Sequence, residues 1–126
     1  SDLLEVLVAA TRPGGLEGTT MEFDDDWAVT VVLASGGYPA SSSSGDVISG
    51  LDAAAAAGAE VIHAGTARTG DGAIVTAGGR VLNVTALGPD PAAARDRAYA
   101  AADLIQFDQR QLRRDIALRA VERVST

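Results

Sequence analysis

The chain has 126 residues, a length that suits one domain with a hydrophobic core of its own. Hydrophobic residues make up 47% and charged residues 21%, which is typical of a folded globular protein and not of a disordered chain. Ten basic against seventeen acidic residues give a net charge of -7, and such a field repels nucleic acid and anionic membranes. We therefore expect no nucleic-acid partner and no membrane partner, and any bound anion needs a local basic site.

The chain contains no cysteine, which excludes disulfide bonds and thiolate chemistry. No positively charged leader precedes an apolar stretch, and no apolar run approaches the ~20 residues that a membrane span needs. The absence of cysteine does not indicate a compartment, so we take the reducing cytosol as the default and expect a cytoplasmic protein. Because the first residue is Ser1 and not an initiator Met, we expect either a fragment of a longer protein or a trimmed chain.

The N-terminal third predicts a helix followed by strands. Apolar residues at helical spacing predict a helix over residues 1–12, which the Pro-Gly-Gly sequence at 13–15 ends. Residues 19–23 predict a short strand. The β-branched run at 28–33 predicts the most buried strand of the domain.

The middle of the chain alternates turns with short elements. Residues 35–39 predict a sharp turn and residues 41–45 a flexible polar loop. The alanine-rich stretch 52–57 predicts a short helix that ends at Gly58, and a strand is predicted at 60–64.

Two more strands are predicted at residues 73–77 and 80–87. Asp-Gly at 71–72 and Gly-Gly at 78–79 supply the positive φ angles of tight hairpin turns at their joints. We therefore expect an antiparallel meander.

The C-terminal third predicts two helices. Asp90 and Pro91 are typical of a helix start, and the apolar face of this helix should cover one side of the sheet. That face consists of Ala94, Ala98, Ala101, Ala102 and Ile105. Residues 109–124 predict a turn or short strand and then a final helix that packs through Ile116, Leu118 and Val121. Segregated strands and helices indicate the α+β class, an antiparallel sheet covered by helices.

The glycine-rich turn with Gly36, Gly37 and Tyr38 follows a strand, as phosphate-binding loops do. It lacks the Lys-Ser/Thr ending of a Walker loop and the spacing of a dinucleotide fingerprint. It is open to two interpretations, a plain turn and a backbone contact with a ligand.

His63 is the only histidine, so no two-histidine metal site can form, and no cysteine replaces the missing ligands. We therefore predict no metal site. His63 itself is expected to be a hydrogen-bonded structural residue, with an acid/base role as the alternative. A Ser-His-Asp arrangement cannot be assigned, and we predict no catalytic residue.

Half of the basic charge lies within fourteen positions of the C-terminal segment, at Arg110, Arg113, Arg114, Arg119 and Arg123. Arginine forks suit phosphate or carboxylate, and Asp115 at i, i+4 from Arg119 is placed to orient a guanidinium. The other interpretation is a solvated helix face with ordinary ion pairs.

Five sequence blocks occur in one order along the chain: VVLASGGYP at 31–39, GDVISGL at 45–51, HAGT at 63–66, GGRVLNVTALG at 78–88 and RRDI at 113–116. This order closely resembles the C-terminal domain of the phosphoribosylamine-glycine ligases, also called glycinamide ribonucleotide synthetases. The resemblance runs from about residue 1 to residue 121.

The resemblance implies part of an ATP-grasp enzyme of de novo purine synthesis, which joins glycine to 5-phosphoribosylamine while ATP is cleaved to ADP and phosphate. ATP and magnesium, or manganese, are then expected between ATP-grasp lobes that precede this chain, and none is expected on the chain alone, which should be inactive. Residues 1–22 would be the last helix and linker of the ATP-grasp region. Residues 23–126 would be the C-terminal domain, whose fold resembles the barrel-like rudiment hybrid of this family.

Related purine ATP-grasp enzymes hold a ribose phosphate through basic residues near the C-terminus. The partners implied are phosphoribosylamine, glycine and the missing ATP-grasp lobes. The substrate-binding residues that we predict are Arg113, Asp115, Arg119, Arg80, Gly36, Gly37 and Tyr38.

Two departures from the family pattern favour an alternative. Ala40, Ser42 and Ser44 stand where the family has glycine, tyrosine and lysine, and Ala117 replaces a glycine. A divergent, non-catalytic binding or interaction module that keeps the fold would tolerate these losses. A third hypothesis is a purely structural domain without a ligand.

Overall fold

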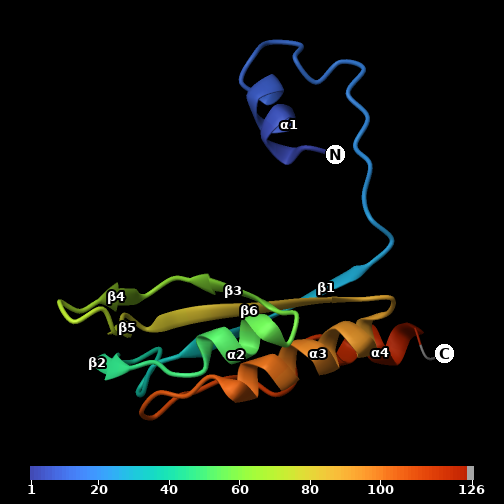
Figure 1. Ribbon diagram of the computed structural model, residues 1–126. Helices are drawn as coiled ribbons and strands as arrows, with labels where there is room; N and C mark the ends of the chain where they lie inside the picture. Colours follow the sequence, from blue (N-terminus) through green and yellow to red (C-terminus); the bar gives the residue numbers. More distant parts are fainter. Residues whose placement is uncertain (125–126) are drawn as a thin grey trace.

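The computed structural model describes residues 1–124. Helix α1 (Leu3–Ala10) confirms the helix predicted at the start of the chain, and it stands apart from the body on an extended linker (Figure 1). Asp2 caps it, since its Oδ1 accepts hydrogen bonds from the backbone N of Leu4 at 2.8 Å and of Glu5 at 3.4 Å. None of its residues is buried.

The strand predicted at residues 19–23 is wrong. No strand of the described residues lies there, and β1 begins only at Trp27. The backbone N of Glu22 donates to Ser1 Oγ at 2.7 Å, and the Ser1 amino group donates to Glu22 O at 3.1 Å. The backbone groups of Glu22 are therefore paired with Ser1, which holds the linker against the start of the chain. Among residues 1–124, no neighbouring strand is available to form backbone hydrogen bonds with residues 19–23.

The strands of the body form two open antiparallel sheets. The first has the order β1-β6-β3, made of β1 (Trp27–Ala34), β6 (Arg80–Gly88) and β3 (Glu60–His63). The second has the order β2-β5-β4, made of β2 (Ser44–Val47), β5 (Ile74–Ala77) and β4 (Thr66–Arg68). Together with the helices, this arrangement confirms the α+β class (Figure 1).

The expected meander is only partly correct. The turn at 71–72 does join the antiparallel pair β4 and β5, with Gly72 at φ +91°. The turn at 78–79 instead carries the chain from one sheet to the other, because β5 and β6 belong to different sheets. Gly65 lies against this crossing: a Cβ there would lie 3.0 Å from Gly78 Cα and 2.7 Å from Arg80 O. This close approach of two backbone segments cannot be predicted from the hydrophobic periodicity of the sequence.

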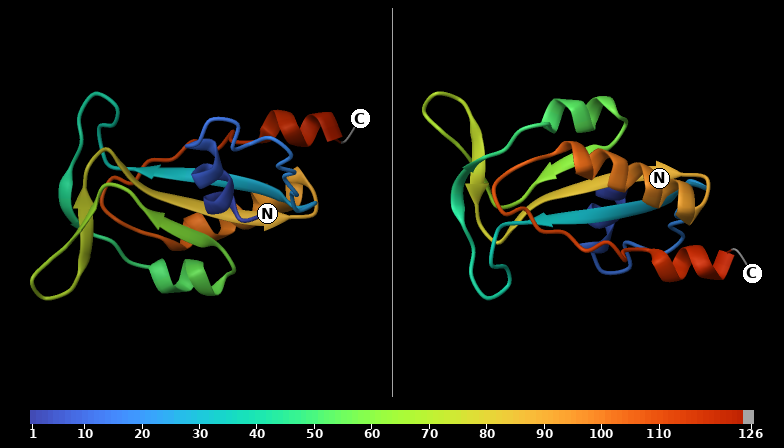
Figure 2. Two further views of the ribbon diagram at one scale, coloured as in Figure 1. Left: turned by 90° about the horizontal axis from the view of Figure 1, so that it is seen from above. Right: turned by 90° about the horizontal axis from the view of Figure 1, so that it is seen from below.

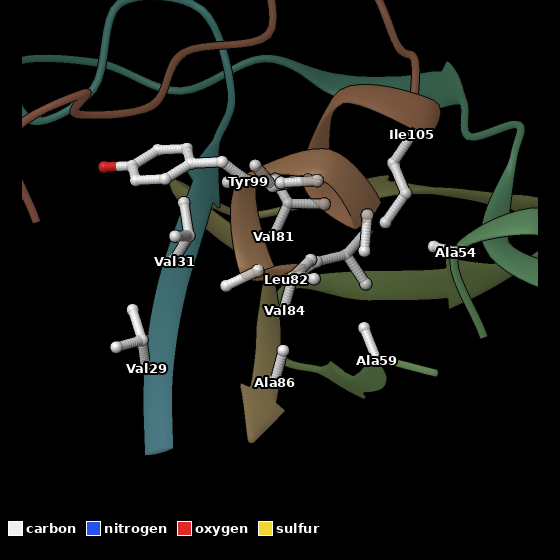
Figure 3. Close-up of a cluster of buried hydrophobic side chains, with 14 of the residues drawn as sticks. Val29, Val31, Ala54, Ala59, Val81, Leu82, Val84, Ala86, Tyr99 and Ile105 are labelled. Carbon is white, nitrogen blue, oxygen red and sulfur yellow. The ribbon is translucent and has the colours of Figure 1, made fainter. Parts of the chain in front are cut away.

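The first sheet is covered on one face by α3 (Pro91–Leu104), and α1 stands away from its other face (Figures 1 and 2). Asp90 caps α3 by accepting from Ala93 N at 2.8 Å, and Pro91 occupies the first turn, as predicted. The five residues of its predicted apolar face are all fully buried. Figure 3 shows the resulting core, with Val29 and Val31 of β1, Val84 and Ala86 of β6, and Tyr99 and Ile105 from the α3 side.

Two short helices complete the fold. Helix α2 (Leu51–Ala56) was predicted, and Gly58 follows it at φ +85°. Helix α4 (Leu118–Val124) was also predicted, but it buries no residue. Ile116 packs against the core as expected, whereas Leu118 is 43% exposed, so that part of the prediction is wrong. The reason is that α4 lies at the edge of the body, where α3 is the helix or strand with which it makes the most contacts.

Candidate functional site

The glycine-rich turn is fastened to the turn before β6. Ser35 is fully buried, its backbone N donates to Gly79 O at 2.9 Å, and its Oγ donates to Gly78 O at 3.0 Å. The Tyr38 ring packs on Gly79, where a Cβ would lie 2.5 Å from Tyr38 Cδ2. Two turns far apart in the sequence thus form one unit, which places Tyr38 close to the start of β6 at Arg80.

Gly36 and Gly37 shape this unit from within. A Cβ on Gly36, which is buried, would lie 2.7 Å from Gln109 Oε1, so the glycine lets the C-terminal segment approach. Gly37 has φ +83°, a conformation that side chains other than glycine rarely adopt. Both observations fit the plain-turn interpretation, and a role in ligand contact stays a prediction.

The C-terminal segment pairs with the end of β1 and then contacts α3. Gln111 and Ala34 exchange both backbone hydrogen bonds at 2.8 Å, so the segment extends the first sheet locally. Two side chains of α3, Arg95 and Tyr99, then hold the backbone of residues 113–116. The sequence alone did not single out either of them. The sequence signal that could have pointed to Tyr99 is a tyrosine inside an alanine-rich apolar face, since a buried tyrosine hydroxyl requires a polar partner.

Arg113 and Asp115 form a two-pronged ion pair. Arg113 Nε donates to Asp115 Oδ1 at 2.9 Å, and Nη2 donates to Oδ2 at 2.6 Å. The hydrogen bond from Arg113 is the main cause that lowers the pKa of the Asp115 carboxyl. Because Asp115 engages the Nε and Nη2 side of the guanidinium, an incoming anion would meet the Nη1 side.

Arg113 borders two hollows of the surface. A cavity of about 370 Å³, called here the Tyr38 cavity, lies between β1, the glycine-rich turn and the C-terminal segment; Tyr38, Arg80, Leu112 and Arg113 are among its lining residues. A second hollow of about 630 Å³, called here the Asp115 cavity, is lined among others by Arg113, Asp115 and Arg119. The predicted residues other than Gly36 and Gly37 therefore gather around these two hollows, with Arg113 common to both.

Two other arginines of the segment are held in structural pairs. Arg114 donates to both oxygens of Asp103 at 2.9 and 2.7 Å, and Arg110 Nη2 lies 3.6 Å from Asp103 Oδ1. Arg110 also donates to Ala102 O at the end of α3. Arg110 and Arg114 thus form ion pairs, as the second interpretation expected, but neither residue lies on a helix face. These pairs tie the segment to α3.

The Asp103 pairs predict an acid-sensitive contribution to stability. The hydrogen bond from Arg114 lowers the pKa of Asp103 in the folded chain, so the stabilisation is present above the unfolded pKa of about 3.9 and is lost as pH falls through the folded value. Asp103→Asn should therefore lower the melting temperature at pH 7, and the difference from wild type should be smaller at pH 2. Thermal unfolding followed by circular dichroism at both values measures this. Asp96→Asn is the control, because Asp96 is 78% exposed and its contact with Arg95 spans 3.7 Å. A deficit of Asp103→Asn as large at pH 2 as at pH 7 would contradict the assignment.

Ala117 shows why a glycine suits its position. It precedes α4 with φ +61°, in the left-handed region that costs a residue with a Cβ about 1 kcal/mol or more. Ala117→Gly should therefore raise the free energy of unfolding by roughly 0.5–1 kcal/mol in urea titrations, despite the added chain entropy. Ala120→Gly, inside α4, is the matched control and should lower the same quantity by a similar amount. Equal destabilisation by both variants would exclude strain at Ala117.

Residues 1–124 offer neither a metal-ligand cluster nor a membrane-spanning helix. Within residues 1–124 no three His, Cys, Asp or Glu side chains lie close enough to hold a metal ion. The hydrogen bond predicted for His63 is confirmed, since Nδ1 lies 3.0 Å from Thr66 Oγ1, although the side chain is exposed. None of the helices of residues 1–124 is long and apolar enough to cross a bilayer.

Comparison with known proteins identifies the family of this domain. Residues 28–119 match the family described as "Phosphoribosylglycinamide synthetase, C domain". The chain belongs to this family. The match includes the lining residues of the Tyr38 cavity and extends through Arg119 of the Asp115 cavity.

Curated relatives and a solved structure agree with the assignment to the synthetase C-domain family. The phosphoribosylamine–glycine ligase of Escherichia coli strain K12 is 47% identical over 98% of the chain, and the chloroplastic ligase of Arabidopsis thaliana is 45% identical over 96%. The crystal structure of the Thermotoga maritima ligase superposes with a TM-score of 0.72 at 32% identity over 90% of the chain. The chain matches the C-terminal part of these ligases and spans only 28%, 23% and 27% of their respective lengths.

Proposed function

We propose that this chain is the C-terminal part of an active phosphoribosylamine–glycine ligase and that it binds the phosphate of 5-phosphoribosylamine. The observation that carries the proposal is the position of Arg113, which borders both cavities and is held by Asp115 in a two-pronged pair. A fixed guanidinium suits a phosphate because its N–H groups match the spacing of the phosphate oxygens.

The other predicted residues have separate roles in this proposal. Asp115 orients Arg113, and Arg119 adds a second positive charge at the Asp115 cavity. Tyr38 and Arg80 form walls of the Tyr38 cavity, whose lining is otherwise largely apolar. Gly36 and Gly37 shape the turn that presents Tyr38. The phosphate would then meet Arg113 and Arg119, with the ribose toward the Tyr38 side.

ATP and Mg²⁺, or Mn²⁺, do not fit this part of the molecule. The described residues contain no cluster of three possible metal ligands, and the glycine-rich turn is used in contacts with Gly79 and Gln109. We assign ATP, the metal ion and glycine to ATP-grasp lobes in the remainder of the ligase, in the cytoplasm. ATP would supply the phosphoryl group that activates glycine there. Residues 1–22 would connect to those lobes, since α1 exposes Leu3, Leu4 and Leu7 by 59%, 68% and 55%.

A hybrid enzyme tests the proposal. In this hybrid ligase the chain replaces the matching C-terminal part of the Escherichia coli K12 relative, and ADP formation is measured. The proposal predicts turnover that requires both glycine and phosphoribosylamine. A hybrid that unfolds cooperatively and binds ATP but forms no ADP with both substrates would overturn it.

A binding module without chemistry is the second candidate, and Ala117 at φ +61° favours it, since a strained alanine stands where the family resemblance implies a glycine. The same hybrid separates the two. If only the variant with Ala40→Gly, Ser42→Tyr, Ser44→Lys and Ala117→Gly turns over, the chain is the divergent module. If the unaltered hybrid turns over, these departures are compatible with catalysis.

A further inference from the structure

The hydroxyl of Tyr99 joins α3 to both ends of the stretch that carries the Arg113–Asp115 pair. It donates to Arg113 O at 2.7 Å and accepts from Ile116 N at 3.1 Å. The side chain is 8% exposed and part of the core. Figure 3 shows the Tyr99 hydroxyl pointing away from the other labelled side chains of the cluster.

Arg95, one turn earlier on α3, reinforces this attachment. Its Nε donates to Ile116 O at 3.1 Å, and its Nη2 donates to Arg114 O at 2.7 Å. The guanidinium carbon of Arg95 lies 4.7 Å from the centroid of the Tyr99 ring, and that of Arg114 lies 5.6 Å away. Arg95 and Tyr99 thus make hydrogen bonds with four backbone groups of residues 113–116, and all four of these hydrogen bonds are to main chain. The Arg113 and Asp115 side chains are left to line the cavities.

The Arg113–Asp115 pair depends on this support. Its side chains are 74% and 56% exposed, and an exposed ion pair by itself is weak and conformationally loose. A recognition group binds better when its geometry is fixed before the ligand arrives, because less ordering accompanies binding. The hydrogen bonds that fix the backbone at residues 113 and 116 hold the Arg113–Asp115 pair in place before a ligand binds. The Tyr99 hydroxyl is not needed to fill the core, since phenylalanine has the same ring.

We propose that Tyr99 is a positioning residue for phosphate recognition: its hydroxyl fixes the backbone of residues 113–116 and so preforms the Arg113–Asp115 pair. The inference rests on the proposed function, and it adds a residue of α3 that touches no substrate.

Tyr99→Phe tests the inference with two measurements. In the isolated chain, ¹⁵N NMR of the Arg113 Nε–Hε group should show faster exchange with water than in wild type, with no ligand present. In the hybrid ligase, the KM for phosphoribosylamine should rise roughly 3- to 10-fold, while the KM values for glycine and ATP stay unchanged.

Thr76→Val is the matched control. Thr76 in β5 is 1% exposed, and its hydroxyl makes two hydrogen bonds of 3.1 Å to Asp46, one as donor and one as acceptor. The variant therefore also removes a buried hydroxyl with two partners, far along the chain from residues 113–116. We expect Thr76→Val and Tyr99→Phe both to lower the melting temperature. Thr76→Val should leave the KM for phosphoribosylamine unchanged.

The outcomes separate the inference from the proposed function. If Arg113→Ala raises the KM for phosphoribosylamine but Tyr99→Phe matches Thr76→Val in both KM and Arg113 exchange, the hydroxyl is only structural and the inference is overturned. If Arg113→Ala itself leaves that KM unchanged, the phosphate site proposed above fails, whatever Tyr99→Phe does to the exchange of Arg113.

Discussion

Gly50→Ala should lower the free energy of unfolding by roughly 3 kcal/mol or more, through overpacking and backbone strain. Gly50 precedes α2 with φ +82°, and a Cβ there would lie 2.0 Å from Leu104 O and 2.8 Å from Leu104 C. That backbone cannot retreat easily, because Ser49 and Gln106 exchange hydrogen bonds of 2.9 and 3.0 Å beside it and Ile105 is fully buried. Urea unfolding followed by circular dichroism measures the loss.

Gly45→Ala is the control for the Gly50 prediction. Gly45 has φ +94°, but a Cβ there meets nothing within 4 Å. It should therefore show the cost of a positive φ alone, roughly 1–2 kcal/mol. Equal losses in the two variants would mean that the approach of α2 to the end of α3 is not as close as described.

Arg113→Ala in the hybrid ligase should raise the KM for phosphoribosylamine roughly 10- to 100-fold, as expected when a charged hydrogen bond of about 1.5–3 kcal/mol is lost. The KM values for glycine and ATP should not change, because Arg113 is assigned to the phosphate alone. Steady-state kinetics with each substrate varied in turn measures this.

Arg123→Ala serves as the charge-matched control for Arg113→Ala. Arg123 lies in the last turn of α4 and carries the same charge, but it is not among the residues that line either cavity. Its replacement should leave every KM near the wild-type value. Similar effects of the two variants would indicate a general electrostatic effect of the C-terminal segment and not a site at Arg113.

Elements that carry local signals could be predicted from the sequence. Helix α3 has an aspartate cap, a first-turn proline and an apolar face, and β1 has a run of β-branched residues. The strands β2 and β4 have four and three residues and no apolar alternation, so only their pairing with β5 defines them. The same limit explains the error at residues 19–23, where the β-promoting residues find no neighbouring strand.

The candidate site shows a similar division. Concentrated arginines and the family resemblance pointed to Arg113, Asp115 and Arg119, and the structure places all three around one cavity. Charge alone could not separate these from Arg110 and Arg114, because the partner that engages them, Asp103, lies on α3 and is found only through the fold. The roles of Arg95 and Tyr99 depend on contacts with main chain, which leave no pattern of residue types.

A crystal structure of the hybrid ligase with its product, glycinamide ribonucleotide, tests the central claim most directly. We predict the phosphate at the Asp115 cavity, with an oxygen about 3 Å from an Arg113 Nη atom and Asp115 still paired with the opposite side of the guanidinium. A phosphate bound elsewhere in the enzyme, with the Arg113–Asp115 pair facing only solvent, would contradict the claim.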